Sequence, residues 1–297
     1  MDEGEEKMDK TVSVVIPTLN AERFINIQLL KLSTQDYPIT EIIVVDSASE
    51  DRTVEICKKH NVHLIQIQRK DFSHAKTRDM VLRQCETDVV VFLTQDAIPY
   101  DNQTVGNLVK ALDQDGVVIA TGRQVAKNDA SAFEKLIREF NYPAVSSVKS
   151  KTDIKRLGIK TFFFSDSFAA YDRKVYLALG GFEKSLKTNE DMFYAAKVIQ
   201  SGYKVAYVAE AKVLHSHNFT LKQQYKRNYI EGYEIEKHKE LLGNVSQESE
   251  GLKLVKYVSK GLLSHGRVLS FIRFGFDCVV RLMGSKAGRK AYLNGED

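Results

Sequence analysis

The stretch from Val12 to Thr18, VSVVIPT, is almost continuously apolar and ends in a proline and a hydroxyl side chain. A run this short cannot form a stable helix, so it predicts a strand buried on both faces. Comparable apolar runs recur at 41–46, 62–67, 88–94 and 117–121, with helical segments between them. This alternation predicts an α/β fold with a mostly parallel central sheet and helices on both faces.

The helical segments between these strands are expected after Asn20 and at 53–59, 74–85 and 103–113. Asparagine commonly caps helices, and Phe24, Ile27 and Leu30 recur at helical spacing after Asn20. We therefore expect Asn20 to cap the first helix and the three apolar side chains to face the core.

The pattern changes after Gln124. Ser131 and Glu134 have the spacing of a capping box at the start of a helix. The other elements expected here are helices at 131–141, 190–201 and 220–242, strands at 161–171 and 204–215, a mobile lysine-rich loop at 148–160 and a polar linker at 244–251. Because no internal repeat is visible, we expect the second half to extend the same core.

Composition excludes several classes of protein. The chain has 297 residues, of which 43% are apolar and 28% charged, which rules out collagen, a disulfide scaffold and a disordered polymer. Cys57, Cys85 and Cys278 lie far apart and show no CxxC spacing, so neither disulfides nor a cysteine zinc site is expected. The acidic start MDEGEEKMDK lacks the features of a secretory signal, and no apolar run approaches the ~20 residues of a membrane span. These features predict a cytoplasmic protein.

The C-terminal tail is strongly basic. Between residues 252 and 290 nine lysines and arginines stand against a single acid, Asp277, and apolar residues recur among them at helical spacing. One interpretation is a cationic amphipathic helix that binds the inner, anionic leaflet of the cell membrane peripherally. The other is a helical appendage packed on its own domain or on a second copy of the chain, as in a homodimer. No nucleic acid partner is expected.

Polar residues gather where three strands end. In an open parallel sheet the carboxyl ends of the strands form the ligand-binding edge. The residues there are Thr18, Asn20, Asp46, Ser47, Gln95 and Asp96. Turn formation or helix capping alone would also explain Asn20 and Asp46. The turn after the first strand, PTLNAERF, lacks glycine-rich phosphate loops, which disfavours dinucleotide dehydrogenases and P-loop enzymes. A nucleotide would therefore need a divalent metal to join its diphosphate to a carboxylate.

Four segments in order resemble the signatures of family 2 inverting glycosyltransferases of the GT-A fold. They are VSVVIPTLN, VVDSASEDRT, FLTQDAIP and GGFEKSLKTNEDM, and the resemblance covers about 11–232. LTQDAIP and VLHSHNFTLKQQYKRNYIEGY are most similar to bacterial rhamnosyltransferases, which use dTDP-L-rhamnose. The resemblance implies a GT-A catalytic domain at 11–243. Within the catalytic domain it implies a nucleotide-binding half at 11–125 and an acceptor half at 126–243. Outside this domain, composition predicts a disordered acidic tail at 1–10 and a basic amphipathic helical tail at 244–297.

The resemblance also implies roles for single residues around the donor nucleotide. The donor-binding set is Pro17, Thr18, Asn20, Asp46, Arg78, Gln95 and Asp96. In the family, the position of Asp46 accepts a hydrogen bond from the base imide N–H. Arg78 matches an arginine near the nucleotide, although Asp79 stands where asparagine is usual. Asp96 matches the last acid of the metal-binding D-x-D motif, which here reads Thr94-Gln95-Asp96 and so lacks its first acid.

His215 and His217 come at the end of a predicted strand, where alternation directs both side chains to one face. One interpretation is that they bind a divalent metal, Mg²⁺ or Mn²⁺, together with Asp96. Of these two ions, Mn²⁺ is the better match for imidazole ligands. The alternative is a pair of surface histidines.

The pair Glu190-Asp191 opens a predicted helix, where acids also serve simply to offset the helix dipole. By resemblance, Asp191 is the general base that removes the proton of the acceptor hydroxyl. The same comparison implies that Glu190 and Asp166 contact the acceptor and that Arg227 neutralises the diphosphate. Asn228 replaces the tryptophan of the family's Q-x-x-R-W element, which favours addition of a single sugar over processive synthesis.

The resemblance therefore implies an enzyme that transfers a sugar with inversion, L-rhamnose from dTDP-L-rhamnose, to a hydroxyl of a cell-surface polysaccharide or lipid-linked glycan. Three alternatives stay open at the level of sequence: a UDP-hexose donor, a nucleotidyltransferase, and a binding-only scaffold that the incomplete D-x-D motif would permit.

Overall fold

One mixed sheet organises the computed structural model, which describes residues 9–243 and 248–296. Its strands are β1 (Val12–Thr18), β2 (Glu41–Asp46), β3 (His63–Gln66), β4 (Val89–Leu93), β5 (Ile98–Pro99), β6 (Val117–Val125), β7 (Ser147–Lys149), β8 (Phe168–Asp172) and β9 (Lys204–Leu214). The order is β3-β2-β1-β4-β8-β6-β9-β5, and β7 also pairs with β9. β5, β7 and β8 run against the other six strands, so the sheet is mostly parallel, as predicted.

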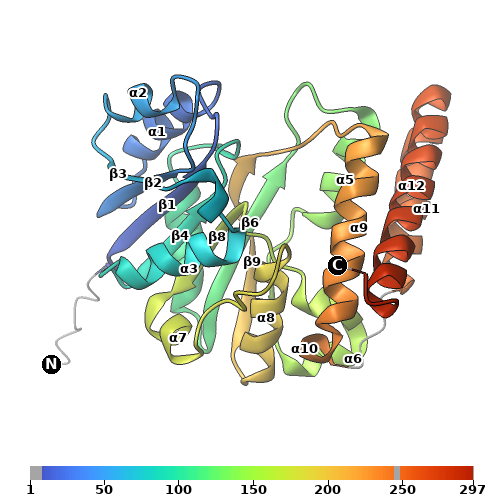
Figure 1. The fold of residues 1–297 in the computed structure, drawn as a ribbon. Helices are drawn as coiled ribbons and strands as arrows, with labels where there is room; N and C mark the ends of the chain where they lie inside the picture. Colours follow the sequence, from blue (N-terminus) through green and yellow to red (C-terminus); the bar gives the residue numbers. More distant parts are fainter. Residues whose placement is uncertain (1–8, 244–247, 297) are drawn as a thin grey trace, which may run out of the picture.

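Helices cover both faces of this sheet (Figure 1). They are α1 (Ile25–Ser33), α2 (Thr53–Cys57), α3 (His74–Gln84), α4 (Thr104–Lys110), α5 (Ala132–Asn141), α6 (Ile154–Leu157), α7 (Arg173–Ala178), α8 (Glu190–Gln200), α9 (Leu221–Lys237), α10 (Lys239–Leu242), α11 (Glu248–Ser264) and α12 (Val268–Leu293). Helices α1 and α4 pack on one face of the sheet, and α3, α7 and α8 on the other. The two resulting apolar cores fix the strand ends that carry the site.

The inward face predicted for α1 is wrong. Ile27 is 43% exposed and Leu30 is 47% exposed, whereas Ile25, Leu29 and Leu32 are buried. Asn20 does not cap the helix either, because a turn separates it from α1, whose first residue follows Phe24. This short helix carries apolar residues on two sides, so its sequence alone does not say which side is buried. Packing against the sheet buries the side with Ile25, Leu29 and Leu32.

The lysine-rich segment predicted as a mobile loop is ordered. It contains β7, α6 and two short 3₁₀ turns, and the strand predicted to begin at 161 begins only at Phe168. Lys149 is buried, and its Nζ donates to the carbonyl oxygen of Phe163 at 2.6 Å. The capping residue predicted for α5 is confirmed, since Ser131 Oγ accepts from Glu134 N at 3.3 Å.

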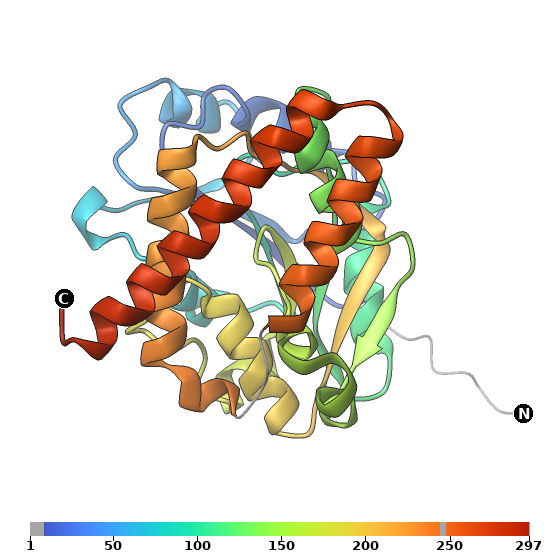
Figure 2. The ribbon, with the colours of Figure 1, turned by 90° about the vertical axis from the view of Figure 1, so that its right-hand side faces the viewer.

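The C-terminal helices α11 and α12 form a hairpin on the outside of α5 and α9 (Figure 2). Val258 and Leu262 of α11 and Phe274 of α12 join Phe133 and Ile137 of α5 in a separate apolar cluster. The predicted tail at 1–10 and the first half of the polar linker predicted at 244–251 lie largely outside the described residues. The second half of that linker prediction is wrong, because α11 already begins at Glu248. In the part of the chain that is described, no helix combines the length and hydropathy needed to cross a bilayer.

Candidate active site

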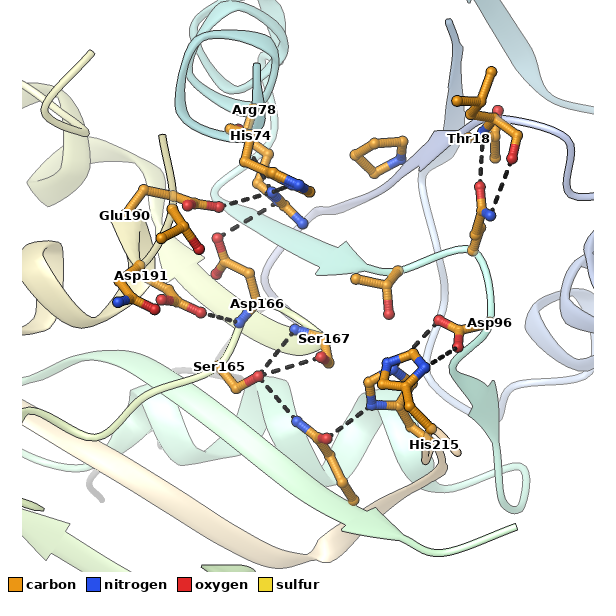
Figure 3. Close-up of a pocket in the computed structure, with 18 of the residues that line it drawn as sticks. Thr18, His74, Arg78, Asp96, Ser165, Asp166, Ser167, Glu190, Asp191 and His215 are labelled. Atoms are coloured by element: carbon orange, nitrogen blue, oxygen red, sulfur yellow. Dashed lines mark hydrogen bonds and ion pairs between the residues drawn. The ribbon is translucent and has the colours of Figure 1, made fainter. Parts of the chain in front are cut away.

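A cleft of about 700 Å³ opens at the carboxyl ends of β1 and β4, and the loops before β8 and α8, the end of β9 and helix α9 complete its walls (Figure 3). It brings together most of the residues singled out from the sequence. Those that line it are Pro17, Thr18, Arg78, Gln95, Asp96, Asp166, Glu190, Asp191, His215, His217 and Arg227. Asn20 and Asp46 are not among its lining residues, although Ser47 is.

Asp46 and Asn20 hold the first two strand-end loops together. The Asp46 carboxylate is fully buried and accepts from Ser49 N at 3.0 Å and Ser49 Oγ at 2.5 Å. Asn20 has a positive φ of 51°, and its Oδ1 accepts from Glu50 N at 2.9 Å. Both side chains therefore shape the wall of the cleft from behind, and Thr18, beside Asp46, reaches the cleft itself.

Gln95 joins the loop after β4 to the loop after β1. Its Oε1 accepts from Leu19 N at 2.7 Å, and its Nε2 donates to Leu19 O at 3.1 Å. The amide oxygen and nitrogen of Gln95 are thus both hydrogen-bonded to the backbone of Leu19. The side chain that precedes Asp96 fixes two walls of the cleft relative to each other.

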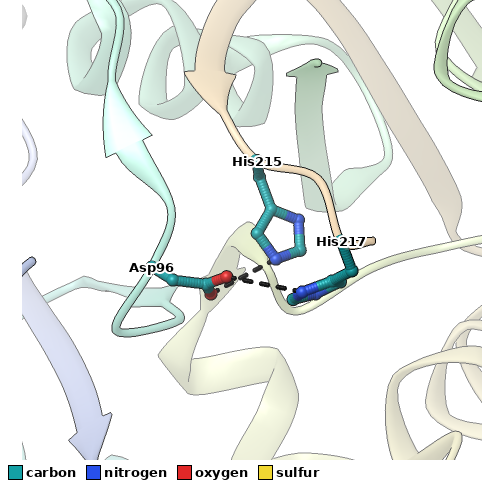
Figure 4. A group of neighbouring side chains, drawn as sticks. All are labelled: Asp96, His215 and His217. Carbon is teal, nitrogen blue, oxygen red and sulfur yellow. Dashed lines mark ion pairs between the residues drawn. The ribbon is translucent and has the colours of Figure 1, made fainter. Parts of the chain in front are cut away.

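Asp96, His215 and His217 form one end of the cleft, which we call the histidine end (Figure 4). His215 Nε2 lies 3.3 Å from one carboxylate oxygen of Asp96, and His217 Nδ1 lies 3.7 Å from the other. Burial by itself would raise the pKa of Asp96, but His215, His217 and Lys127 hold it well below its usual range. Burial lowers the pKa of His215, and burial together with His215 lowers that of His217 to about 4. The cluster is therefore a carboxylate between neutral imidazoles.

The neighbours of His215 assign its tautomer. Gln124 Oε1 accepts from the Arg138 guanidinium, which can only donate, and Gln124 Nε2 donates to Ser165 Oγ at 2.9 Å. His215 Nδ1, 2.8 Å from the same Gln124 oxygen, must then be the donor. In the neutral imidazole, which burial favours by lowering the pKa of His215, Nε2 then directs a lone pair toward an Asp96 oxygen, so two acceptors face each other.

A cation between these acceptors resolves the conflict. Histidine ligands of metals usually donate their second ring N–H to a fixed acceptor, as His215 does to Gln124. The ligand atoms of Asp96, His215 and His217 all lie within 4.8 Å of one another. These three residues therefore fit a divalent metal ion, even though the sequence lacks the first acid of D-x-D.

Arg78, Asp166, Glu190 and Asp191 form the other end of the cleft, the acid end (Figure 3). Arg78 Nη1 lies 2.8 Å from Glu190 Oε1, and Arg78 Nε lies 3.5 Å from Asp166 Oδ2. Asp191 Oδ2 accepts from Asp166 N at 3.0 Å, and its Oδ1 accepts from Met192 N at 2.8 Å. One buried arginine thus pairs with two of the acids, while backbone N–H groups hold the third, Asp191.

This crowding changes the acidity of Asp191. Burial and the negative charge of Glu190 raise its pKa to about 6, and burial raises that of Asp166 as well. Asp191 is half-buried and faces the cleft from the first turn of α8. A carboxylate with a pKa near neutrality is well suited to accept a proton and pass it on.

Several residues of the site were missed from the sequence. Gln124, Arg138, Tyr142, His74 and Ser165 all line the cleft. Gln124 was missed because the strand was expected to end at Thr121, whereas β6 continues to Val125. With the correct end, Gln124 would have joined the polar residues at the carboxyl ends of the strands. The others come from helices and loops whose placement depends on the whole fold.

Helix α9 provides the remaining wall. Arg227 lines the cleft, with its Nε 2.8 Å from Glu231 Oε1 and its guanidinium over the ring of Phe219. Asn228, which stands at the tryptophan position of Q-x-x-R-W, lies near Gly284 of α12 and outside the set of lining residues.

Comparison with known proteins agrees with this geometry. The chain matches the model of the family described as glycosyl transferase family 2 over residues 13–180. It is 43% identical over 223 residues to the O-antigen chain rhamnosyltransferase RfbN of Salmonella typhimurium, covering 74% of this chain and 71% of that protein. It is 41% identical over 223 residues to the O-antigen chain rhamnosyltransferase WbaN of Salmonella anatum, covering 74% and 70%.

Two solved structures have a similar fold. A mannosyltransferase from Pyrobaculum calidifontis in complex with GDP-Man and Mn²⁺ superposes with a TM-score of 0.67 at 17% identity, over 98% of this chain and 89% of that one. TarS of Staphylococcus aureus in complex with UDP-GlcNAc gives 0.55 at 18% identity, over 96% and 92%. These structures establish the GT-A architecture. With the match over residues 13–180, they lead to one conclusion: the chain belongs to glycosyl transferase family 2 and is a glycosyltransferase.

Proposed function

We propose that the protein transfers L-rhamnose from dTDP-L-rhamnose, with inversion at the anomeric carbon, to a hydroxyl of a growing cell-surface polysaccharide or lipid-linked glycan. The identities of 43% and 41% with two O-antigen chain rhamnosyltransferases support the choice of sugar. We propose a cytoplasmic reaction, because the three cysteines are unpaired thiols.

The histidine end would hold the donor diphosphate. A divalent metal, for which we favour Mn²⁺, would be bound by Asp96, His215 and His217 and would supply positive charge to the leaving diphosphate. Arg227 lies over the ring of Phe219, which stacks on His217, and would add a permanent positive charge near the same group. Pro17 and Thr18 would border the base, with the loop that Asp46 and Asn20 hold behind them.

The acid end would activate the acceptor. As the acceptor oxygen forms its bond to the anomeric carbon, the bond between that carbon and the diphosphate breaks, and Asp191 takes the hydroxyl proton. Glu190 and Asp166 would orient sugar hydroxyls, while Arg78 keeps these two acids from repelling each other. A single displacement of this kind inverts the anomeric centre and turns a β-linked donor into an α-L-rhamnoside.

The observation that carries this proposal is the position of Asp191. Its carboxylate has a pKa raised to about 6 and lines the same cleft as the cluster of Asp96, His215 and His217. A base and a cation site in one cleft are the two parts that an inverting transfer from a nucleotide sugar needs.

The test is release of the nucleoside diphosphate by the purified chain with Mn²⁺ and three donors in parallel: dTDP-L-rhamnose, UDP-glucose and UDP-GlcNAc. We expect turnover with dTDP-L-rhamnose that stops on addition of EDTA. Preference for a UDP-hexose would replace the sugar assignment and leave the mechanism intact. Absence of turnover with every donor, together with unchanged behaviour of Asp191→Asn, would support a scaffold that only binds.

A further inference from the structure

Helix α12 packs on α9 through its smallest residues. A methyl group placed on Gly284 would lie 2.6 Å from the carbonyl oxygen of Tyr225, and one on Gly288 would overlap the carbonyl oxygen of Tyr229. Ala291 is buried on the same side of the helix. The two helix backbones therefore approach so closely that large side chains cannot lie between them.

Apart from Phe274 and Phe271, which pack on α5, most of the large apolar side chains of α12 are exposed. Leu269 is 84% exposed and Phe276 is 62% exposed, and neighbours at intervals of three or four residues are at least half exposed. We call this stripe the outer face of α12; its members are Leu269, Ile272, Phe276, Val279, Leu282 and Met283. Helices on the surface of a soluble protein normally bury such a stripe and expose polar residues. Here the pattern is reversed, in a helix that lies at the right-hand side of Figure 1 and faces the viewer in Figure 2.

The charges around the outer face are positive. Arg273, Lys286 and Lys290 of α12 are exposed, and Lys253, Lys256 and Lys260 are exposed on the neighbouring α11. The acid of α12, Asp277, is buried and bound to Arg281 at 2.5 Å. Between Gly251 and Gly295, within the described residues, no acid is exposed. The outer face is thus an apolar stripe bordered by cations.

We infer that the outer face of α12 docks the protein onto an anionic lipid surface, with the helix lying in the plane of the membrane. A leaflet that contains anionic lipid offers an apolar interior for the stripe and negative charge for the lysines and arginines at once. A second copy paired through the same face offers an apolar surface but no negative charge. Two-fold pairing through this face would bring cations together with no exposed acid of α12 to pair with them.

This surface lies close to the cleft. Helix α9 separates the two, since Arg227 lines the cleft while the backbone of Tyr225 and Tyr229 contacts α12. The cleft is therefore about one helix diameter, ~10 Å, from the docked helix. That distance suits an acceptor whose sugar lies near the lipid headgroups. This statement about the acceptor rests on the proposed function, whereas the docking surface does not.

The test is flotation of the full chain with vesicles of phosphatidylcholine alone and of phosphatidylcholine with a quarter phosphatidylglycerol, at low and high salt. We expect binding to the anionic vesicles that weakens with salt. The double variant Ile272→Asp, Phe276→Asp should bind roughly tenfold more weakly or worse, because it places charge where apolar area is buried. The matched control is Leu30→Asp, Val145→Asp, which changes two exposed apolar residues elsewhere and should bind like the unaltered chain.

Circular dichroism and release of nucleoside diphosphate from the donor should be the same for both double variants, which shows that each is folded. Equal binding by the two variants, or no preference for anionic vesicles, would overturn the inference. A dimer in solution that only the Ile272, Phe276 variant abolishes, without vesicle binding, would also overturn it and assign the face to a second copy. Because vesicle binding needs no donor, this outcome is separate from that of the proposed reaction.

Discussion

The two ends of the cleft use the same residue type in opposite ways. At the histidine end, Asp96 is surrounded by two imidazoles and Lys127, which keep its pKa well below the usual range. At the acid end, burial and the nearby charge of Glu190 raise the pKa of Asp191 to about 6. The neighbouring groups therefore determine what each aspartate can do. Asp96 stays ionised and is suited to bind a cation, whereas Asp191 is suited to exchange a proton.

The supporting residues differ in the same sense. Gln124 and Arg138 fix His215 so that its lone pair faces Asp96. Arg78 instead offsets acids that would otherwise repel one another. A substitution at the histidine end should therefore alter the affinity for Mn²⁺, and a substitution at the acid end should alter the rate of transfer or its pH dependence.

The largest effect is expected at the acid end. Asp191→Asn keeps the shape of the side chain but removes the base, so transfer should fall by about 10²–10⁴-fold. Binding of Mn²⁺ and of dTDP should stay unchanged, because the histidine end and the Pro17–Thr18 wall would hold them and Asp191 lies at the other end of the cleft. Asp115→Asn, at an exposed acid outside the cleft, is the control. If the Asp191 variant keeps full turnover, the base lies elsewhere.

A smaller effect is expected from the support of the histidine end. Gln124→Leu removes the acceptor that fixes the tautomer of His215, so affinity for Mn²⁺ should fall about 10–100-fold. Electron paramagnetic resonance of free Mn²⁺ during a titration measures this without turnover. Gln124→Glu keeps an acceptor and should retain most of the affinity, and Gln114→Leu, on the surface, should change nothing. Equal losses in the Leu and Glu variants would contradict the tautomer argument.

The smallest effect concerns pH. Because Asp191 must be ionised to accept a proton, kcat/KM should rise as the pH passes through about 6. Glu190→Gln removes the charge that opposes this ionisation, so the acid limb should move to lower pH by roughly one unit. The exposed Glu55→Gln should leave the profile unchanged. A limb that stays in place, or moves upward, would show that another group controls it.

The sequence predicted the strands well and the helix faces less well. Parallel strands that are buried on both faces have continuous apolar sequences, and β1 and β2 match their predicted bounds. The inward face of α1 was wrong because a short amphipathic pattern does not say which side meets the sheet. The order in 148–160 could not be seen either, because it depends on carbonyl groups that accept from a buried Lys149.

The site shows a similar division. Strand ends and the resemblance placed Asp96, His215, His217 and Asp191 in one cleft, while their individual roles remain predictions. The amide of Gln95 and the carboxylate of Asp46 are used on neighbouring backbone and hydroxyl groups, which residue type alone does not reveal. The contacts of Gln124 join segments far apart in the chain and become visible only in the folded protein.

The central claim is that a cation belongs to the histidine end and a proton acceptor to the acid end. Anomalous diffraction at the manganese edge, from crystals grown with Mn²⁺ and dTDP, tests it most directly. We predict one manganese peak within bonding distance of Asp96, His215 and His217, with the diphosphate beside it. A peak among Asp166, Glu190 and Asp191, which offer more carboxylates, would contradict the account.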